Sequence, residues 1–154
     1  MTNYWLMKSE PHVYSFDDLM KDGSTHWDGV RNYQARNFMR DKMKLGDIVL
    51  YYHSNTKPPH IAGISKICKE SYPYITQFDK KSKYYDPKAT EKVPRWFLID
   101  MEPVTKFDEM VTLDQLKENP ALEEMLVIKR GQRLSVQPVD KVHFDEVCNM
   151  ANTK

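Results

Sequence analysis

Short strand-like segments, separated by helices in no regular order, constrain the fold of this sequence most strongly. The apolar segments compatible with strands are Tyr4–Lys8, Ile48–His53, Ile61–Lys69, Trp96–Glu102, Leu126–Lys129 and Leu134–Val136. Because these segments do not alternate regularly with helices, they predict an α+β fold and not a doubly wound parallel sheet. We expect five or six strands, curled into a barrel-like sheet so that few strand edges stay open.

Local signals at helix ends predict four helices between these strands. Ser15 with Asp18 three residues later is typical of a helix N-terminus, and Gly23 is typical of a C-terminus. Thr112 and Gln115 form a capping-box pair. The predicted helices are Phe16–Asp22, Asn32 to about Lys44, Thr112 to near Pro120, and Asp140 to about Met150. Gly63 inside a strand indicates a bulge or a close backbone approach. Tyr72–Pro94 is a long polar segment, with a weak strand signal at Tyr74–Phe78.

The charge of the chain is nearly balanced overall but unevenly distributed. Its 154 residues carry a formal net charge of +1, which argues against a strongly basic protein that coats DNA without regard to sequence. Residues 31–44 nevertheless hold five basic residues against one acidic, and residues 80–95 hold six against two. Residues 100–125 hold eight acidic residues against two basic ones. A basic face arises if the two basic segments meet in space; otherwise they are ordinary solvated surface.

The size and termini of the chain predict one domain over residues 1–154, present as a monomer in the cytoplasm. Cys68 and Cys148 are isolated, which is typical of reduced thiols. The N-terminus lacks the basic and long apolar parts of a secretory signal. The longest clean apolar run, Ile48–Tyr52, is too short to cross a bilayer, so we expect no membrane partner.

Catalytic and metal-binding patterns are weak in this sequence. The five histidines show no spacing typical of a metal site, and there is neither a nucleophile elbow nor a phosphate-binding glycine loop. We therefore expect no metal and no cofactor. His53 and Glu10 are the modest candidates for acid–base chemistry, and neither has an evident partner in the sequence.

The segment Trp27–Asn37 carries the strongest functional signal. It combines a Trp, a Tyr, two Arg and three side-chain amides within eleven residues. Flat apolar rings beside planar hydrogen-bonding groups suit a flat, polar ligand such as a nucleobase. Tyr51–Asn55 adds polar side chains at the end of a predicted buried strand, where a pocket often opens.

Several motifs together resemble the EVE domain, which belongs to the PUA-like group with YTH and ASCH domains and is typified by the thymocyte nuclear protein family. The resemblance extends from about Tyr4 to Val147. The motifs that carry it are Tyr4–Pro11, Trp27–Asn37, Tyr51–Asn55, Ile61–Gly63, Tyr85–Pro87 and Gln132–Pro138. It implies a PUA-like pseudo-barrel flanked by helices, with a pocket for a flipped, chemically modified base. The start of the chain at its first strand, without a basic arm, suggests a prokaryotic member.

The resemblance also implies where the site residues lie. Trp27 and Tyr33 would form walls of the pocket and Asn32 would read the edge of the base. The remaining pocket and rim residues would be Ser54, Asn55, Ser9, His53 and Ser135. Basic side chains at Arg31, Arg36, Lys80, Lys81 and Arg133 would contact the phosphates of DNA or RNA, which makes binding dependent on salt.

Three functions compete on this basis. The first is a non-catalytic reader of a modified base, either modified cytosine in DNA or a methylated base in RNA. The second is an enzyme that acts on a flipped base or a free nucleotide. The third is a module on the same fold that binds a small molecule or a protein.

Overall fold

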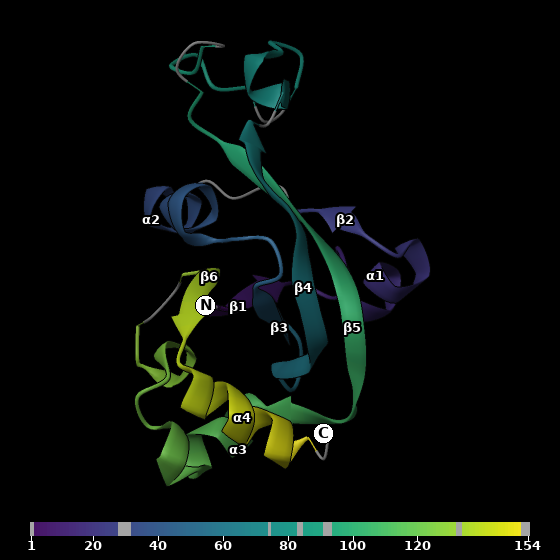
Figure 1. The fold of residues 1–154 in the computed structure, drawn as a ribbon, viewed down its shortest axis with the longest axis vertical. Helices are drawn as coiled ribbons and strands as arrows, with labels where there is room; N and C mark the ends of the chain where they lie inside the picture. Colours follow the sequence, from purple (N-terminus) through teal and green to yellow (C-terminus); the bar gives the residue numbers. More distant parts are fainter. Residues whose placement is uncertain are drawn as a thin grey trace.

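A six-stranded sheet built around one parallel pair of strands organises the protein (Figure 1). The structure is a computed structural model that describes residues 2–27, 32–73, 75–82, 85–90, 94–131 and 134–151. The strands, β1 to β6, are Tyr4–Ser9, Thr25–His26, Ile48–His53, His60–Pro73, Phe97–Thr112 and Val136–Val139. Their order in the sheet is β2–β5–β4–β3–β1–β6, and among the described strands only β1 and β3 pair in parallel. The predicted α+β fold with five or six strands is confirmed.

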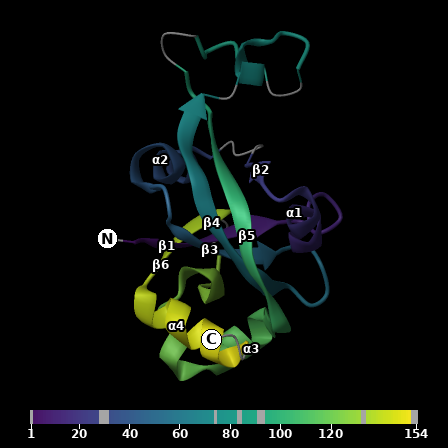
Figure 2. The same ribbon diagram turned by 45° about the vertical axis from the view of Figure 1, so that its right-hand side comes forward.

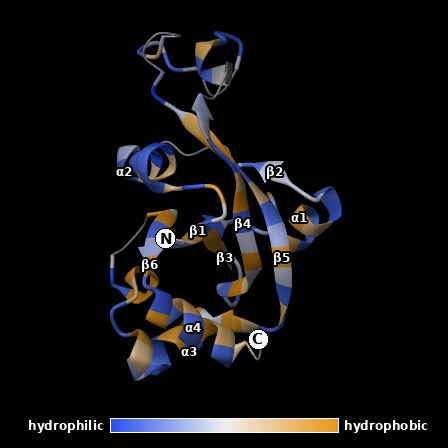
Figure 3. Cartoon of the chain, in the orientation of Figure 1, coloured by the Kyte–Doolittle hydropathy of each residue, from blue (hydrophilic) through white to orange (hydrophobic). Residues whose placement is uncertain are grey.

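Helices cover both faces of this sheet (Figures 1 and 2). They are α1 (Phe16–Asp22), α2 (Tyr33–Asn37), α3 (Leu113–Glu118) and α4 (Lys141–Met150). Because side chains alternate along a strand, β1 and β3 contribute to two cores. Trp5 and Tyr51 pack in the core that includes residues of α1 and α2, whereas Leu6 and Leu50 pack in the core that includes α3 and α4. Hydrophobic residues accordingly colour much of β1 and β3 at the centre of the molecule (Figure 3).

The predicted helix caps are confirmed. Ser15 accepts a hydrogen bond from the backbone N–H of Asp18, whose carboxylate accepts from Ser15 in return, and Gly23 ends α1 with a φ of 83°. Thr112 and Gln115 form the same reciprocal pair at the start of α3. The second helix begins where predicted and then changes form, because α2 continues as a π-helix over Phe38–Lys42.

Some strand predictions are wrong. Leu126–Ile128 and Ile75–Phe78 form short 3₁₀ helices, and the last strand begins at Val136 instead of covering Leu134–Val136. Strand β2 was not predicted, because its two residues depend entirely on pairing with β5. Strands β4 and β5 are also longer than predicted, because each supplies the other with backbone partners beyond its apolar segment.

The long β4 and β5 form an arm that rises beyond α2 and β2 (Figures 1 and 2). Gln77 secures the segment that follows β4. Its side-chain oxygen accepts from the backbone N–H groups of Arg95 and Trp96 at 2.8 Å, and its amide nitrogen donates to the Trp96 carbonyl at 2.9 Å. Gln77 is fully buried. Its hydrogen bonds connect the segment after β4 with the residues just before β5.

Gly63 lies where β4 is approached from both sides. A Cβ atom at this position would lie 2.7 Å from the Thr105 carbonyl oxygen and 2.8 Å from two ring carbons of Phe16. The pairing of β4 with its neighbours shifts register beside Gly63. The expectation of a close backbone approach is therefore confirmed by the Thr105 carbonyl, and the ring of Phe16 from α1 packs against the same position.

Substituting Gly63 with Ala should destabilise the protein by about 1–3 kcal/mol, the usual cost of an overpacked core. Urea unfolding measures this loss. In a double-mutant cycle, Phe16→Leu should recover part of the Gly63→Ala penalty, because it removes the ring but leaves the Thr105 carbonyl. Additive effects of the two substitutions would contradict the proposed contact.

Both ring nitrogens of His53, at the end of β3, form hydrogen bonds: Nε2 joins the residue to α1, and Nδ1 joins it to His60 on β4. The backbone N–H of Phe16 donates to His53 Nε2 at 3.1 Å, so this nitrogen must be an acceptor. His53 Nδ1 therefore carries the proton toward His60 Nε2, 3.1 Å away, and His60 Nδ1 in turn donates to the Pro58 carbonyl. Burial, with the neighbouring His60, lowers the pKa of His53 to about 4.

This pKa predicts a loss of stability in mild acid. Because an unfolded histidine titrates near pH 6.5, the unfolded chain binds a proton at His53 before the folded protein does. The contribution of neutral His53 is present above pH 6.5 and falls by about 3 kcal/mol as the pH drops to 4. Urea unfolding between pH 7.5 and 4.5 should show a shallower pH dependence for His53→Gln. The same pH dependence in both proteins would contradict this assignment.

Candidate functional site

Aromatic rings gather around Tyr51 where β1 and β3 end side by side. Phe16, Trp27 and His53 each present an edge-to-face contact to its ring, with centroids 5.3, 5.5 and 5.7 Å away. The Tyr51 hydroxyl donates to the Tyr14 carbonyl at 2.9 Å, and burial raises the pKa of this phenol, so it stays a neutral donor. Trp27, from the segment that carried the strongest sequence signal, is thereby held against the strand ends.

Trp27 differs from the other two tryptophans in its hydrogen bonding. The indole N–H of Trp5 donates to the buried Asp47 carboxylate at 3.0 Å, and that of Trp96 donates to Asp86 at 2.6 Å. Trp27 is only 7% exposed, and its backbone N–H donates to the Ile99 carbonyl at 2.8 Å. No described residue, however, accepts a hydrogen bond from its indole N–H. Buried indole groups normally have a partner, so this donor suits a ligand that supplies one.

The predicted residues at the strand ends lie close together. The backbone N–H of Ser54 donates to the Ser9 carbonyl at 3.0 Å, and the Ser9 hydroxyl donates to the Tyr14 carbonyl at 2.7 Å. His53 packs on Tyr51 in the same region. Asn55 is exposed and has a φ of 53°, which is typical of an Asn in a tight turn. Ser9, His53 and Ser54 thus lie beside the rings that surround Tyr51.

Ser135 joins the first strand from the other side. Its carbonyl accepts from the backbone N–H of Lys8 at 2.9 Å, next to the pairing of β1 with β6. The residue is half-buried.

Asn32 and Tyr33 open α2. The Asn32 side-chain oxygen accepts from the backbone N–H of Ala35 at 3.0 Å, so it caps the helix. The Tyr33 ring stacks on Trp96, with centroids 5.0 Å apart and planes 16° apart. Both residues are exposed, and their contact with a base remains a prediction.

Sequence reasoning missed Trp96, Arg95 and Gln77. Trp96 was placed in a strand, and the long polar segment before it gave no sign that Gln77 would fix its backbone. The signal that could have found them is the pair of bulky or charged residues at the end of a polar segment, Arg95-Trp96.

The predicted basic residues are only partly placed. Arg36 lies on α2, where its guanidinium donates to the Arg95 carbonyl at 2.9 Å. Lys80 and Lys81 are exposed in the segment between β4 and β5. Arg31 and Arg133 lie outside the described residues, as do Asp28, Gly29 and Val30 from the strongest motif. The phosphate contacts of all five basic residues remain predictions.

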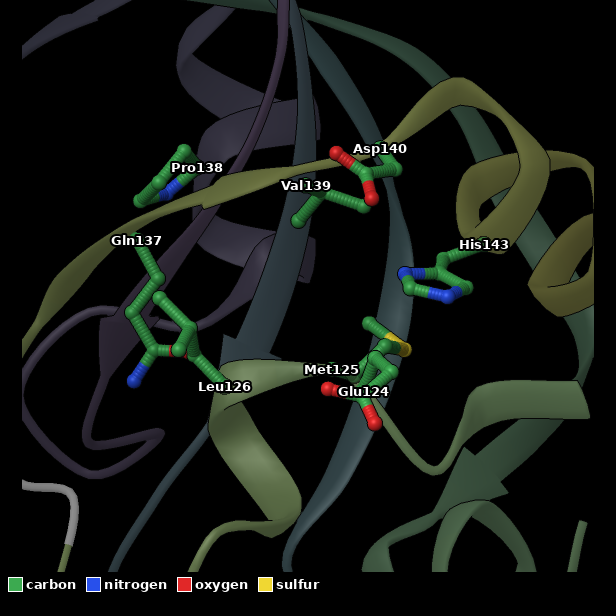
Figure 4. A pocket seen from close by; sticks show the side chains of 8 residues that line it. All are labelled: Glu124, Met125, Leu126, Gln137, Pro138, Val139, Asp140 and His143. Carbon is green, nitrogen blue, oxygen red and sulfur yellow. The ribbon is translucent and has the colours of Figure 1, made fainter. Parts of the chain in front are cut away.

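A separate pocket of about 200 Å³ lies beside the core that includes α3 and α4 (Figure 4). It is lined by Glu124, Met125, Leu126, Gln137, Pro138, Val139, Asp140 and His143. None of these was predicted to bind a base. Among the described residues, no group of three or more His, Cys, Asp or Glu side chains is placed to hold a metal ion. No described helix has the length and apolar character needed to cross a membrane.

Comparison with known proteins shows similar sequences and the same fold in eukaryotes and bacteria. Mouse thymocyte nuclear protein 1 is 41% identical over 173 residues, which cover 100% of this chain and 76% of the mouse protein. A crystal structure of the human THYN1 protein, in complex with DNA that contains 5-methylcytosine, matches with a TM-score of 0.89 and 41% identity. The match covers 99% of each chain. A crystal structure from Pseudomonas syringae matches with a TM-score of 0.89 and 44% identity, over 96% of this chain and 99% of the other.

The matches include both eukaryotic and bacterial proteins. The prokaryotic origin and the cytoplasmic location expected from the sequence therefore remain predictions. An ASCH protein from Zymomonas mobilis, 10% identical with a TM-score of 0.54 over 96% of this chain and 98% of the other, shares the fold. The expected PUA-like architecture is therefore confirmed. The family model of the EVE domain matches residues 3–150. With that match and relatives above 40% identity, the chain belongs to the EVE domain family.

Proposed function

We propose that this protein is a non-catalytic module that binds nucleic acid by holding a flipped, modified base, with 5-methylcytosine in DNA as the first candidate. The observation that carries the proposal is the indole N–H of Trp27, a donor without a described acceptor in a residue that is 7% exposed. The human relative in complex with 5-methylcytosine-containing DNA supports the choice of ligand.

The chemistry around Trp27 suits a cytosine base. The carbonyl oxygen or ring nitrogen of the base would accept a hydrogen bond from the indole N–H, for which no described residue is an acceptor. Stacking against an aromatic ring replaces the stacking that a flipped base loses, a contribution of about 1–3 kcal/mol. A methyl group adds apolar surface, and aromatic walls are a favourable environment for it.

The candidates for acid–base catalysis are engaged in structural contacts, which supports binding without catalysis. Both ring nitrogens of His53 are already engaged, Nε2 by the backbone N–H of Phe16 and Nδ1 by His60 Nε2. The carboxylate of Glu10 lies 2.9 Å from Nε2 of His12, and both side chains are exposed. Methylated RNA is the alternative ligand within the same proposal, and the experiment below includes it as a separate arm.

Trp27→Phe tests the proposal because it removes the indole N–H and keeps an aromatic ring against Tyr51. Loss of one hydrogen bond to the base should weaken binding to an oligonucleotide with 5-methylcytosine by about 3- to 10-fold. Fluorescence anisotropy with matched methylated and unmethylated DNA, and with methylated RNA, measures the affinities. Plain cytosine offers the same carbonyl oxygen and ring nitrogen, so both affinities should fall and the ratio of methylated to plain affinity should change little.

The unsubstituted protein provides the decisive comparison. Equal affinity for methylated and plain oligonucleotides would refute selective reading of the modification. An unchanged affinity of Trp27→Phe would instead show that the indole N–H does not contact the base. Thermal unfolding of both proteins controls for loss of structure.

A further inference from the structure

The ring of Tyr33 contacts an aromatic ring and two guanidinium groups, which come from α2 and from the residues just before β5. One contact is the stack on Trp96, at 5.0 Å and 16°. The guanidinium carbon of Arg36 lies 4.7 Å from the centroid of the Tyr33 ring, and that of Arg95 lies 5.7 Å from it. We call Tyr33, Trp96, Arg36 and Arg95 the Tyr33 cluster. Although Tyr33 makes three contacts, 46% of it remains exposed.

The Tyr33 cluster is rigidly supported. Trp96 is held by its hydrogen bond to Asp86 and by the hydrogen bonds of its backbone to Gln77. Arg36 donates to the Arg95 carbonyl at 2.9 Å and to the Asn37 side-chain oxygen at 2.7 and 3.0 Å. A guanidinium fixed in this way loses little conformational freedom when it binds a ligand.

The two guanidiniums of the cluster are not paired with any carboxylate that the structure describes. The described acceptors of Arg36 are a carbonyl and an amide oxygen, and no described carboxylate forms an ion pair with Arg36 or Arg95. Burial, then the neighbouring Arg40, lowers the pKa of Arg36. Arg40 itself is paired with Asp41 at 2.8 Å. The positive charge at Arg36 and Arg95 is therefore available to an external anion.

The cluster is close to the candidate base site along β5. Trp27 is attached to β5 through the Ile99 carbonyl, and Trp96 comes three residues earlier in the same chain segment. Three extended residues span about 10 Å. Since successive nucleotides of a stacked strand are about 3.4 Å apart, this separation corresponds to about three of them. One bound strand can thus reach both places.

We propose that the Tyr33 cluster is a phosphate clamp, in which Arg36 and Arg95 bind the backbone of the strand that carries the flipped base. Tyr33 is a positioning residue that holds the Arg36 guanidinium by its ring. Arginine suits this ligand because its planar group donates two parallel hydrogen bonds to a phosphate. The clamp rests on the proposed function for the identity of the strand, but it predicts a property that the pocket does not control.

The experiment is the salt dependence of DNA binding by Arg95→Gln, Tyr33→Leu and Tyr33→Phe. Each lost phosphate contact should make the slope of log affinity against log salt shallower by about 0.7–0.9. Arg95→Gln and Tyr33→Leu should show this change and bind about 10-fold more weakly at low salt. Tyr33→Phe, which keeps the ring, should behave as the unsubstituted protein. The ratio of methylated to plain affinity should stay unchanged in all three.

Lys141→Gln is the matched control. It removes one positive charge from α4, at the end of the molecule opposite the arm (Figures 1 and 2). This variant should keep the slope of the unsubstituted protein. Circular dichroism confirms that each variant is folded.

Two outcomes would overturn the clamp. One is an unchanged salt slope in Arg95→Gln and Tyr33→Leu. The other is a fall in the methylated-to-plain ratio in Tyr33→Leu, which would return Tyr33 to the wall of the base pocket. If the unsubstituted protein shows no selectivity for methylated DNA, the proposed function fails, whereas the salt slopes still decide the clamp on plain DNA.

Discussion

The burial of Tyr51 at the end of the parallel strand pair is the constraint on which the candidate site depends. Its ring is the shared surface for Phe16, Trp27 and His53, which come from three separate stretches of the chain. Phe16 in turn fills the space that Gly63 leaves open on the neighbouring strand. The position of Trp27 is therefore set by packing against the central sheet, as precise recognition requires.

The parts of the fold that local chemistry determines could be predicted from the sequence. Ser15, Asn32 and Thr112 cap helices where expected, because a capping hydrogen bond joins residues only three positions apart. The extension of β4 and β5 could not be predicted, because polar residues there become strand through pairing with distant residues. Leu126–Ile128 shows the opposite case, since an apolar run with no strand partner turned into a 3₁₀ helix.

The candidate site, like the fold, could be predicted only in part from the sequence. The composition of Trp27–Asn37 and the motif at Tyr51–Asn55 pointed to the strand ends, where Ser9, His53 and Ser54 do lie together. That Trp27 has no indole acceptor among the described residues could not be predicted, because Trp5 and Trp96 have the same side chain and contact carboxylates only through the fold. The contact of Trp96 with Tyr33 could not be predicted either, because it depends on the hydrogen bond between the Trp96 backbone and the distant Gln77 side chain.

Strand β5 connects the two places where we propose that nucleic acid binds. It receives the backbone hydrogen bond of Trp27 at Ile99, and the residue just before it, Trp96, supports Tyr33. A hydrogen bond to a base edge depends on the chemistry of that base, whereas a contact with phosphate does not. The site that selects the base and the site that binds the nucleic-acid backbone would thus be held at a fixed spacing by β5. Each site would respond to different substitutions. Such a separation lets the base pocket change its specificity while the affinity for the backbone is retained.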